Sequence, residues 1–236
     1  MESDAKWYSQ TFGKYLETNL YNKDKTLFEI LEEGVLKIKK EYALLAKDNK
    51  VLDFPSAAAS IVRLNGDLVE FYTIYDCIIL VQDIFGNIFD IYDSRNAIND
   101  NIVMTSARAK ATELGLTTKQ VGQKYPEIIS EGRQLRNTYG HQYVLADDVS
   151  AVKNGICFSM KKNLVQKIMI MSDGFSQCFD MFKFISKEKF MNKINSLKDI
   201  EKYYNKLRKH QKKDSEGQKY LRYKESDDAT IVVMKF

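Results

Sequence analysis

One short segment of the sequence combines residue types that could act on a phosphate group. Residues 133–143 read RQLRNTYGHQY. An arginine is a planar, permanently charged fork for phosphate, a histidine can move a proton near neutral pH, and an asparagine can orient either one. On a helix, Arg136 and Tyr143 are seven residues apart and Asn137 and His141 are four apart, so all four would share one polar side. These are the parts for cleaving a phosphodiester without a metal.

The composition draws attention to this segment, because the 236 residues contain only two histidines, His141 and His210. Sites built from three imidazoles are therefore excluded within one chain. The sequence has no glycine-rich phosphate loop, no G-x-S-x-G elbow and no cluster typical of a two-metal carboxylate site. We expect no metal and no cofactor. The alternative for the segment itself is purely structural, with Arg136 an ordinary surface arginine and His141 a hydrogen-bonded histidine.

Arg136 followed by Asn137, then His141 and Tyr143, resembles the R-x4-H-x-Y signature of the HEPN superfamily, in the form seen in HepT-type toxins. The resemblance implies an all-α, homodimeric, metal-independent endoribonuclease in which two copies of the motif share one cleft. Arg136 would bind the scissile phosphate, and His141 would act as general acid or base while the ribose 2′-hydroxyl attacks. Asn137 would orient the pair, and the product would be a 2′,3′-cyclic phosphate.

The same resemblance implies partners and a setting. Tyr143 matches the tyrosine that a nucleotidyltransferase antitoxin modifies, and the expected partners are RNA, a second copy of the chain and such an antitoxin. The setting would be a toxin–antitoxin system or phage defence. Arg133, Arg108 and Lys110 are further candidates for RNA phosphate contacts. Two rivals stay open: a catalytically inactive HEPN module that binds RNA, nucleotide or a protein, and a helical interaction protein in which the motif is a coincidence.

The elements that must position these residues are predicted to be helices, since 11 Gly and 2 Pro impose few turns. Apolar residues from Leu27 to Leu45 recur every three or four positions, which indicates an amphipathic helix. The same spacing from about 61 to 93 predicts a long, nearly surrounded helix. Its polar stripe, Asp76, Asp83 and Asp90, is either a solvated face or a set of acids supporting a site.

Further helices are expected over 105–114, ending at Gly115, and then after a cap at Thr117 or Thr118. Others are expected from Pro126 through 145, over about 161–186 and over about 196–212. Residues 146–160 are expected to form a loop, either with or without a short extended piece. Residues 220–223 and 230–236 flank the acidic turn ESDD and predict a small hairpin or edge strand. The predicted fold is an all-α HEPN-like bundle over 1–213, with a strand-like tail over 214–236.

Charge and cysteines bear on the compartment. The 36 basic and 32 acidic residues give a net charge of +4, too small to imply wholesale polyanion binding. Three widely spaced cysteines, Cys77, Cys157 and Cys178, are typical of reduced thiols in the cytoplasm. The polar N-terminus carries no signal peptide, and polar residues interrupt the most apolar stretch, 71–92. We therefore expect a cytoplasmic protein that does not enter a membrane.

Overall fold

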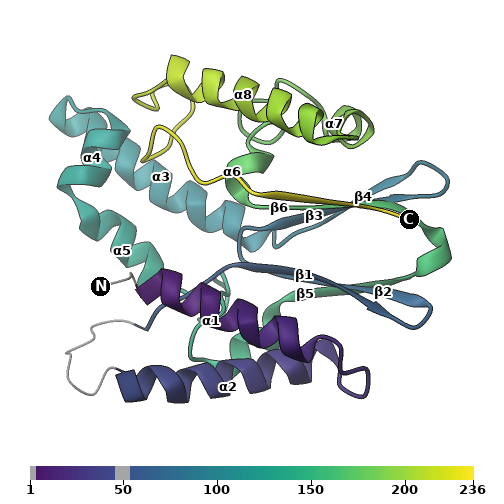
Figure 1. The fold of residues 1–236 in the computed structure, drawn as a ribbon. Helices are drawn as coiled ribbons and strands as arrows, with labels where there is room; N and C mark the ends of the chain where they lie inside the picture. The colour runs from purple at the N-terminus through teal and green to yellow at the C-terminus, as the bar shows by residue number, and fades with distance from the viewer. Residues whose placement is uncertain (1–3, 46–53) are drawn as a thin grey trace.

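The computed structural model describes residues 4–45 and 54–236, and it is a mixed α/β structure. Within these ranges, seven strands form two antiparallel sheets (Figure 1). One has the order β1 (Ala59–Asn65), β2 (Leu68–Ile74), β5 (Ile156–Lys161). The other has the order β4 (Ile88–Ile91), β3 (Ile78–Asp83), β6 (Val165–Met171), β7 (Ile231–Lys235). The all-α prediction is wrong.

Helices cover the outer faces of both sheets (Figure 1). On the three-stranded sheet lie α1 (Asp4–Asn19) and α2 (Leu27–Leu45), and on the four-stranded sheet lie α6 (Asp173–Ser176), α7 (Lys187–Lys193) and α8 (Leu197–Lys213). Beside this sandwich stand α3 (Arg95–Leu114), α4 (Thr118–Lys124) and α5 (Pro126–Gln134). Short 3₁₀ turns occupy Val149–Asn154 and Lys162–Leu164.

The long helix predicted over 61–93 is wrong, because this stretch forms most of β1 and all of β2, β3 and β4. In β3, Ile79 and Val81 pack between the sheets, whereas Ile78 and Leu80 pack under the helices. Both faces of the strand are therefore buried. Buried strands lose the polar alternation that marks a half-exposed strand, and an uninterrupted apolar run fits helical spacing equally well.

Some of the other predicted helices are present in the structure, and one is not. The predicted helices at α2 and α8 are confirmed, as are the end of α3 at the left-handed Gly115 and the start of α5 at Pro126. Of the two predicted caps, Thr117 is the one that caps α4, in a capping box with Gln120. The helix expected over 161–186 is wrong, since this segment contains β6 and only the four-residue α6.

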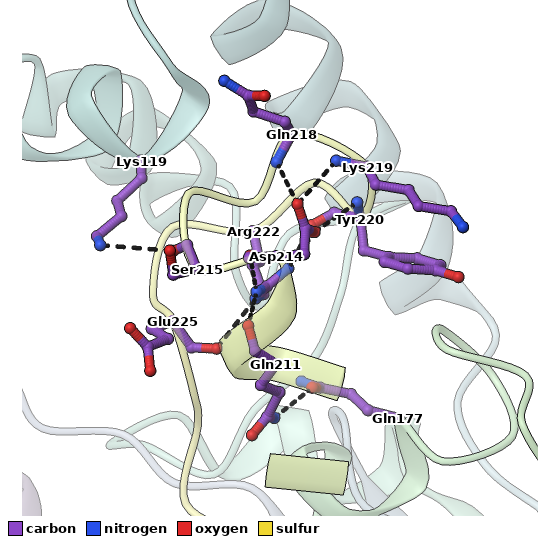
Figure 2. Close-up of polar contacts among 10 residues, drawn as sticks. All are labelled: Lys119, Gln177, Gln211, Asp214, Ser215, Gln218, Lys219, Tyr220, Arg222 and Glu225. Atoms are coloured by element: carbon purple, nitrogen blue, oxygen red, sulfur yellow. Dashed lines mark hydrogen bonds and ion pairs between the residues drawn. The ribbon is translucent and has the colours of Figure 1, made fainter. Parts of the chain in front are cut away.

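The C-terminal segment is held by a buried arginine rather than by a hairpin with residues 220–223. The edge strand expected near the C-terminus is confirmed as β7, which pairs with β6. Before it, the Arg222 guanidinium donates to Asp214 Oδ2 at 2.8 Å, to Gln211 O at 2.8 Å and to Glu225 O at 3.1 Å (Figure 2). Asp214 also accepts the N–H groups of Gln218, Lys219 and Tyr220. The domain boundary at residue 213 stays a prediction.

None of the helices in the described ranges has both the length and the apolar character that crossing a bilayer requires.

Candidate functional site

Strand register places three aspartates at one edge of the four-stranded sheet. Ile78 of β3 pairs with Met171 of β6, and Met171 pairs with Ile231 of β7. Asp76 lies two residues before the first of these positions, Asp173 two residues after the second, and Asp227 four residues before the third. Because adjacent antiparallel strands begin and end at the same edge, the three carboxylates gather there. We call Asp76, Asp173 and Asp227 the acidic edge.

Asp76 lies where the chain crosses from one sheet to the other. The preceding residue, Tyr75, has φ 72°, a left-handed conformation that is uncommon for a bulky residue. Two side chains hold it there: Asn96 Nδ2 donates to the Tyr75 carbonyl, and the Arg136 guanidinium donates to its hydroxyl at 2.9 Å. The crossing turn is therefore fixed from both sides.

Asp173 and Asp227 are brought together by a close approach of two backbone segments. Ser172 N donates to Thr230 O at 3.1 Å, and Ser172 Oγ donates to Asp228 O at 3.3 Å. Gly174 lies directly under the second segment, where an added Cβ would stand 2.0 Å from the Asp228 carbonyl oxygen. Only glycine fits this position without a shift of the backbone.

Two carboxyl groups of the acidic edge, those of Asp76 and Asp173, resist ionisation. Burial first, and then the negative charges of Asp173 and Asp100, raise the pKa of Asp76 to about 7. Burial and the charge of Asp227 raise the pKa of Asp173 to about 6. Asp76 thus feels the negative charge of Asp173, and Asp173 that of Asp227, in a partly desolvated place. A cation at this edge would relieve that repulsion.

The donor set fits a hard divalent cation, since it consists of carboxylate oxygens only. As arranged in the described part of the chain, no three His, Cys, Asp or Glu side chains converge on a single ion position. Mg²⁺ does not need such a cage, because it keeps several waters and is commonly held by one or two carboxylates together with a substrate phosphate. The acidic edge matches this mode of binding.

Arg136, predicted from sequence as a phosphate-binding residue, lies against the crossing turn beside the acidic edge. Its guanidinium stacks over the Tyr75 ring at 5.0 Å and donates to Ser56 Oγ at 3.2 Å. Its Nε is buried without a hydrogen-bond partner among the described residues. Its positive charge also counters the raised pKa of Asp76.

The other residues of the predicted motif do not share a helix face with Arg136. The helix ends at Gln134, and a tight turn follows, in which Asn137 and Gly140 have φ values of 58° and 83°. Asn137 N donates to Gln142 O, and His141 N donates to Thr138 O. Tyr143 is buried in the core under the Arg95 guanidinium, 4.7 Å from its ring. The helical stacking predicted for these residues is wrong.

Two further candidates, Arg108 and Lys110, do not join the acidic edge. Arg108 is exposed on α3, and Lys110 pairs with Glu113 at 3.2 Å and lies over the Tyr125 ring. The side chain of Arg133 lies outside the described residues.

Asp173 and Asp227 were missed by the sequence analysis, although a signal exists. Each lies within four residues of an apolar strand, in the segments MIMSDG and SDDATIVVM, and Asp173 precedes a glycine. Asp76 belonged to the predicted polar stripe, whose other members have structural roles. Asp83 caps the turn into β4, and Asp90 pairs with Lys187. The alternative in which an acid of that stripe supports a site therefore concerns Asp76 alone.

No family model matches the chain, and no curated protein matches it. Solved structures do. The chain is similar to the Mycobacterium tuberculosis serine/threonine phosphatase PstP/Ppp, with 14% identity over 98% of this chain and 82% of that one, at a TM-score of 0.53. It is also similar to the serine/threonine phosphatase Stp1 from Staphylococcus aureus, with 13% identity over 97% of this chain and 76% of that one, at a TM-score of 0.51. A third similar structure is that of a bacterial serine phosphatase, with 13% identity over 95% of this chain and 77% of that one, at a TM-score of 0.50.

These likenesses show the fold, which is that of the bacterial serine/threonine phosphatases. The HEPN resemblance is therefore wrong, and with it the endoribonuclease and the toxin–antitoxin or phage-defence setting that it implied. The short motif misled because its residues lie on a turn at the end of α5 instead of on the helix that the resemblance requires.

Proposed function

We propose that the chain hydrolyses phosphate monoesters with the help of divalent cations held at the acidic edge. The observation that carries the proposal is the convergence of Asp76, Asp173 and Asp227 from the ends of three paired strands, with raised pKa values for the first two. The shared fold with serine/threonine phosphatases supports it.

The aspartates would hold the cation, and when bound it supplies Lewis-acid polarisation of a phosphoryl oxygen and a water of lowered pKa. Arg136 is placed to offset phosphate charge, because its guanidinium lies beside Tyr75, one residue from Asp76. Ser56 and Tyr75 accept two of its hydrogen bonds and fix its orientation, which lowers the entropy lost when a phosphate binds.

Hydrolysis of p-nitrophenyl phosphate with Mn²⁺ or Mg²⁺ tests the proposal. Asp173→Asn should lower kcat/KM by at least about a hundredfold, because it removes a charge that holds the cation. Asp24→Asn, at an exposed loop position, removes the same charge elsewhere and should leave the rate unchanged. Calorimetric titration of Mn²⁺ into both variants checks the step before chemistry. A folded wild-type chain with no cation-dependent turnover, or equal rates in both variants, would overturn the proposal.

A second candidate is a phosphatase-fold module that binds phosphorylated proteins without cleaving them. The fixed guanidinium of Arg136 favours it, since Ser56 and Tyr75 orient this group without any cation. Such a module would bind a phosphoserine peptide, lose that affinity in Arg136→Gln, and release no phosphate at any cation concentration.

The remaining expectations about setting and partners stay proposals. The three cysteines are free, which supports a reducing compartment such as the cytoplasm. The partners predicted from the sequence, which are RNA, a second copy of the chain and an antitoxin, are not tested by the structure.

A further inference from the structure

Helix α8 presents a straight row of lysines. Lys198, Lys202, Lys206, Lys209 and Lys213 follow one another at steps of four, four, three and four residues, so they lie on one face of the helix. We call these five residues the lysine ridge. At 1.5 Å per residue it is about 22 Å long. All five side chains are exposed.

The opposite face of α8 anchors the helix and turns the ridge outward. Tyr203, Leu207 and Gln211 are buried, the first two in the core over the four-stranded sheet. Ser196 caps the first turn by accepting the Asp199 N–H at 3.3 Å. In Figure 1, α8 forms the outermost layer on its side of the molecule. The ridge is therefore a fixed array of charges on a rigid support.

Helix α8 carries more net positive charge than the whole chain does. Seven basic and two acidic residues give α8 a net charge of +5, against +4 for all 236 residues, so the remainder of the chain is slightly acidic. Lysines elsewhere form ion pairs, as Lys25 does with Glu33 and Lys39 with Asp147. Within the described ranges, no ridge lysine forms an ion pair. Lys206 lies over the Phe184 ring and Lys202 attracts Asp199, and the ridge as a whole keeps a surplus of positive charge for an external partner.

A histidine beside the ridge responds to this positive charge. His210 stacks on Phe184 at 4.7 Å, and Lys206 lies over the same ring at 4.6 Å. Burial first, and then the charges of Lys206, Lys213 and Lys219, lower the pKa of His210.

We propose that the lysine ridge binds the phosphate backbone of double-stranded nucleic acid without reading its sequence. Lysines are point charges suited to phosphates, and a rigid row of them can follow one backbone. Asn205 and Lys212 flank the row on one side, and Asp199 and His210 flank it on the other. The aromatic rings that border the row, Phe184 and His210, already stack on each other, and no apolar side chain of α8 on this face could enter a lipid surface. Duplex is therefore favoured over single strands and over membranes.

The salt dependence of binding is the sharpest test. With three to five phosphates contacted, the slope of log K against log salt should be roughly −3 to −4.5 for a short random-sequence duplex. In the triple variant Lys202→Gln, Lys206→Gln, Lys209→Gln, the magnitude of the slope should fall by about 2.7, because three phosphate contacts are lost. The matched control Lys14→Gln, Lys161→Gln, Lys162→Gln removes the same charge at exposed positions off α8 and should leave the slope nearly unchanged.

Fluorescence anisotropy with the full chain supplies these slopes, and circular dichroism confirms that both triple variants are folded. Equal slopes in the two triple variants, or a wild-type slope shallower than about −1, would overturn the proposal. So would tighter binding to phosphatidylserine vesicles or to a single strand than to the duplex. Asp173→Asn should bind the duplex as the wild type does, so this test is independent of the phosphatase proposal.

Discussion

Gly174→Ala is the substitution whose effect the structure specifies most closely. The new Cβ would stand 2.0 Å from the Asp228 carbonyl oxygen, whereas ordinary contacts begin at 3.4 Å, so the two segments must separate by about 1.4 Å. The obstacle is backbone, and it cannot turn aside as the end of a side chain would. Its displacement would also stretch the hydrogen bond that Ser172 Oγ donates to the same oxygen.

The expected cost is the sum of two effects. Overpacking a tight contact costs roughly 1–3 kcal/mol. Losing one neutral hydrogen bond adds about 1 kcal/mol. We therefore expect Gly174→Ala to lower the free energy of unfolding by about 2–4 kcal/mol. Asp227 would move with its neighbour, so the affinity for Mn²⁺ should fall as well.

Urea denaturation followed by circular dichroism measures the first effect, and calorimetric titration the second. Gly13→Ala is the matched control, since it lies inside α1 with nothing within 4 Å of the added Cβ. It should stabilise the chain by about 0.5–1 kcal/mol, because alanine favours the helix. If Gly174→Ala changes stability by less than about 0.5 kcal/mol, the close approach at the acidic edge is not what holds this region.

Three further predictions concern buried or crowded charges. Asp76→Asn should stabilise the cation-free chain above pH 7 and lose that advantage towards pH 4. The reason is that a carboxyl whose folded pKa is raised to about 7 makes the wild type less stable as the pH rises from 4 to 7. Equal stability of the two chains at every pH would contradict this prediction. Lys167→Met should lower the free energy of unfolding, measured by urea denaturation, by about 2–4 kcal/mol. The buried ammonium donates to Met191 O, Ile194 O and Asn195 Oδ1, and methionine leaves these oxygens unpaired. The control Lys161→Met, on exposed β5, should change this free energy little. Lys206→Gln should raise the pKa of His210 in an NMR titration, with His141 as the internal reference, and an unmoved value would argue against the crowding of positive charge on α8.

What the sequence could predict depended on how many faces of an element are buried. The amphipathic α2 and α8 bury one stripe each, so their apolar spacing revealed them. The strands β2 and β3 bury both faces, and their run of apolar residues fitted a helix. The turn signals were present: Asn65-Gly66 and Gly86-Asn87 lie between the paired strands, and both glycines have positive φ. Giving those turns more weight would have broken the predicted helix into hairpins.

The candidate site was harder to predict than the fold, because its residues are distant in sequence. Asp76, Asp173 and Asp227 become neighbours only through the register of β3, β6 and β7, which no local pattern encodes. Arg136 was selected for its neighbours in sequence, Asn137 and His141, whereas its contacts in the structure are Tyr75 and Ser56. The phosphate-binding role of Arg136 stays a proposal, and Asn137 and His141 are not its contacts.

The long sequence separations within the acidic edge have a kinetic consequence. Contacts between strands so far apart require the closure of long loops, which slows folding. The acidic edge is complete only after β6 has paired with β3 and β7 has joined them, so an unfolded or half-folded chain offers no equivalent cation site. A ligand that binds only the native state raises stability with its concentration. Mn²⁺ should therefore slow unfolding while leaving the early steps of refolding unchanged, which makes the ion a reporter of the last strand to dock.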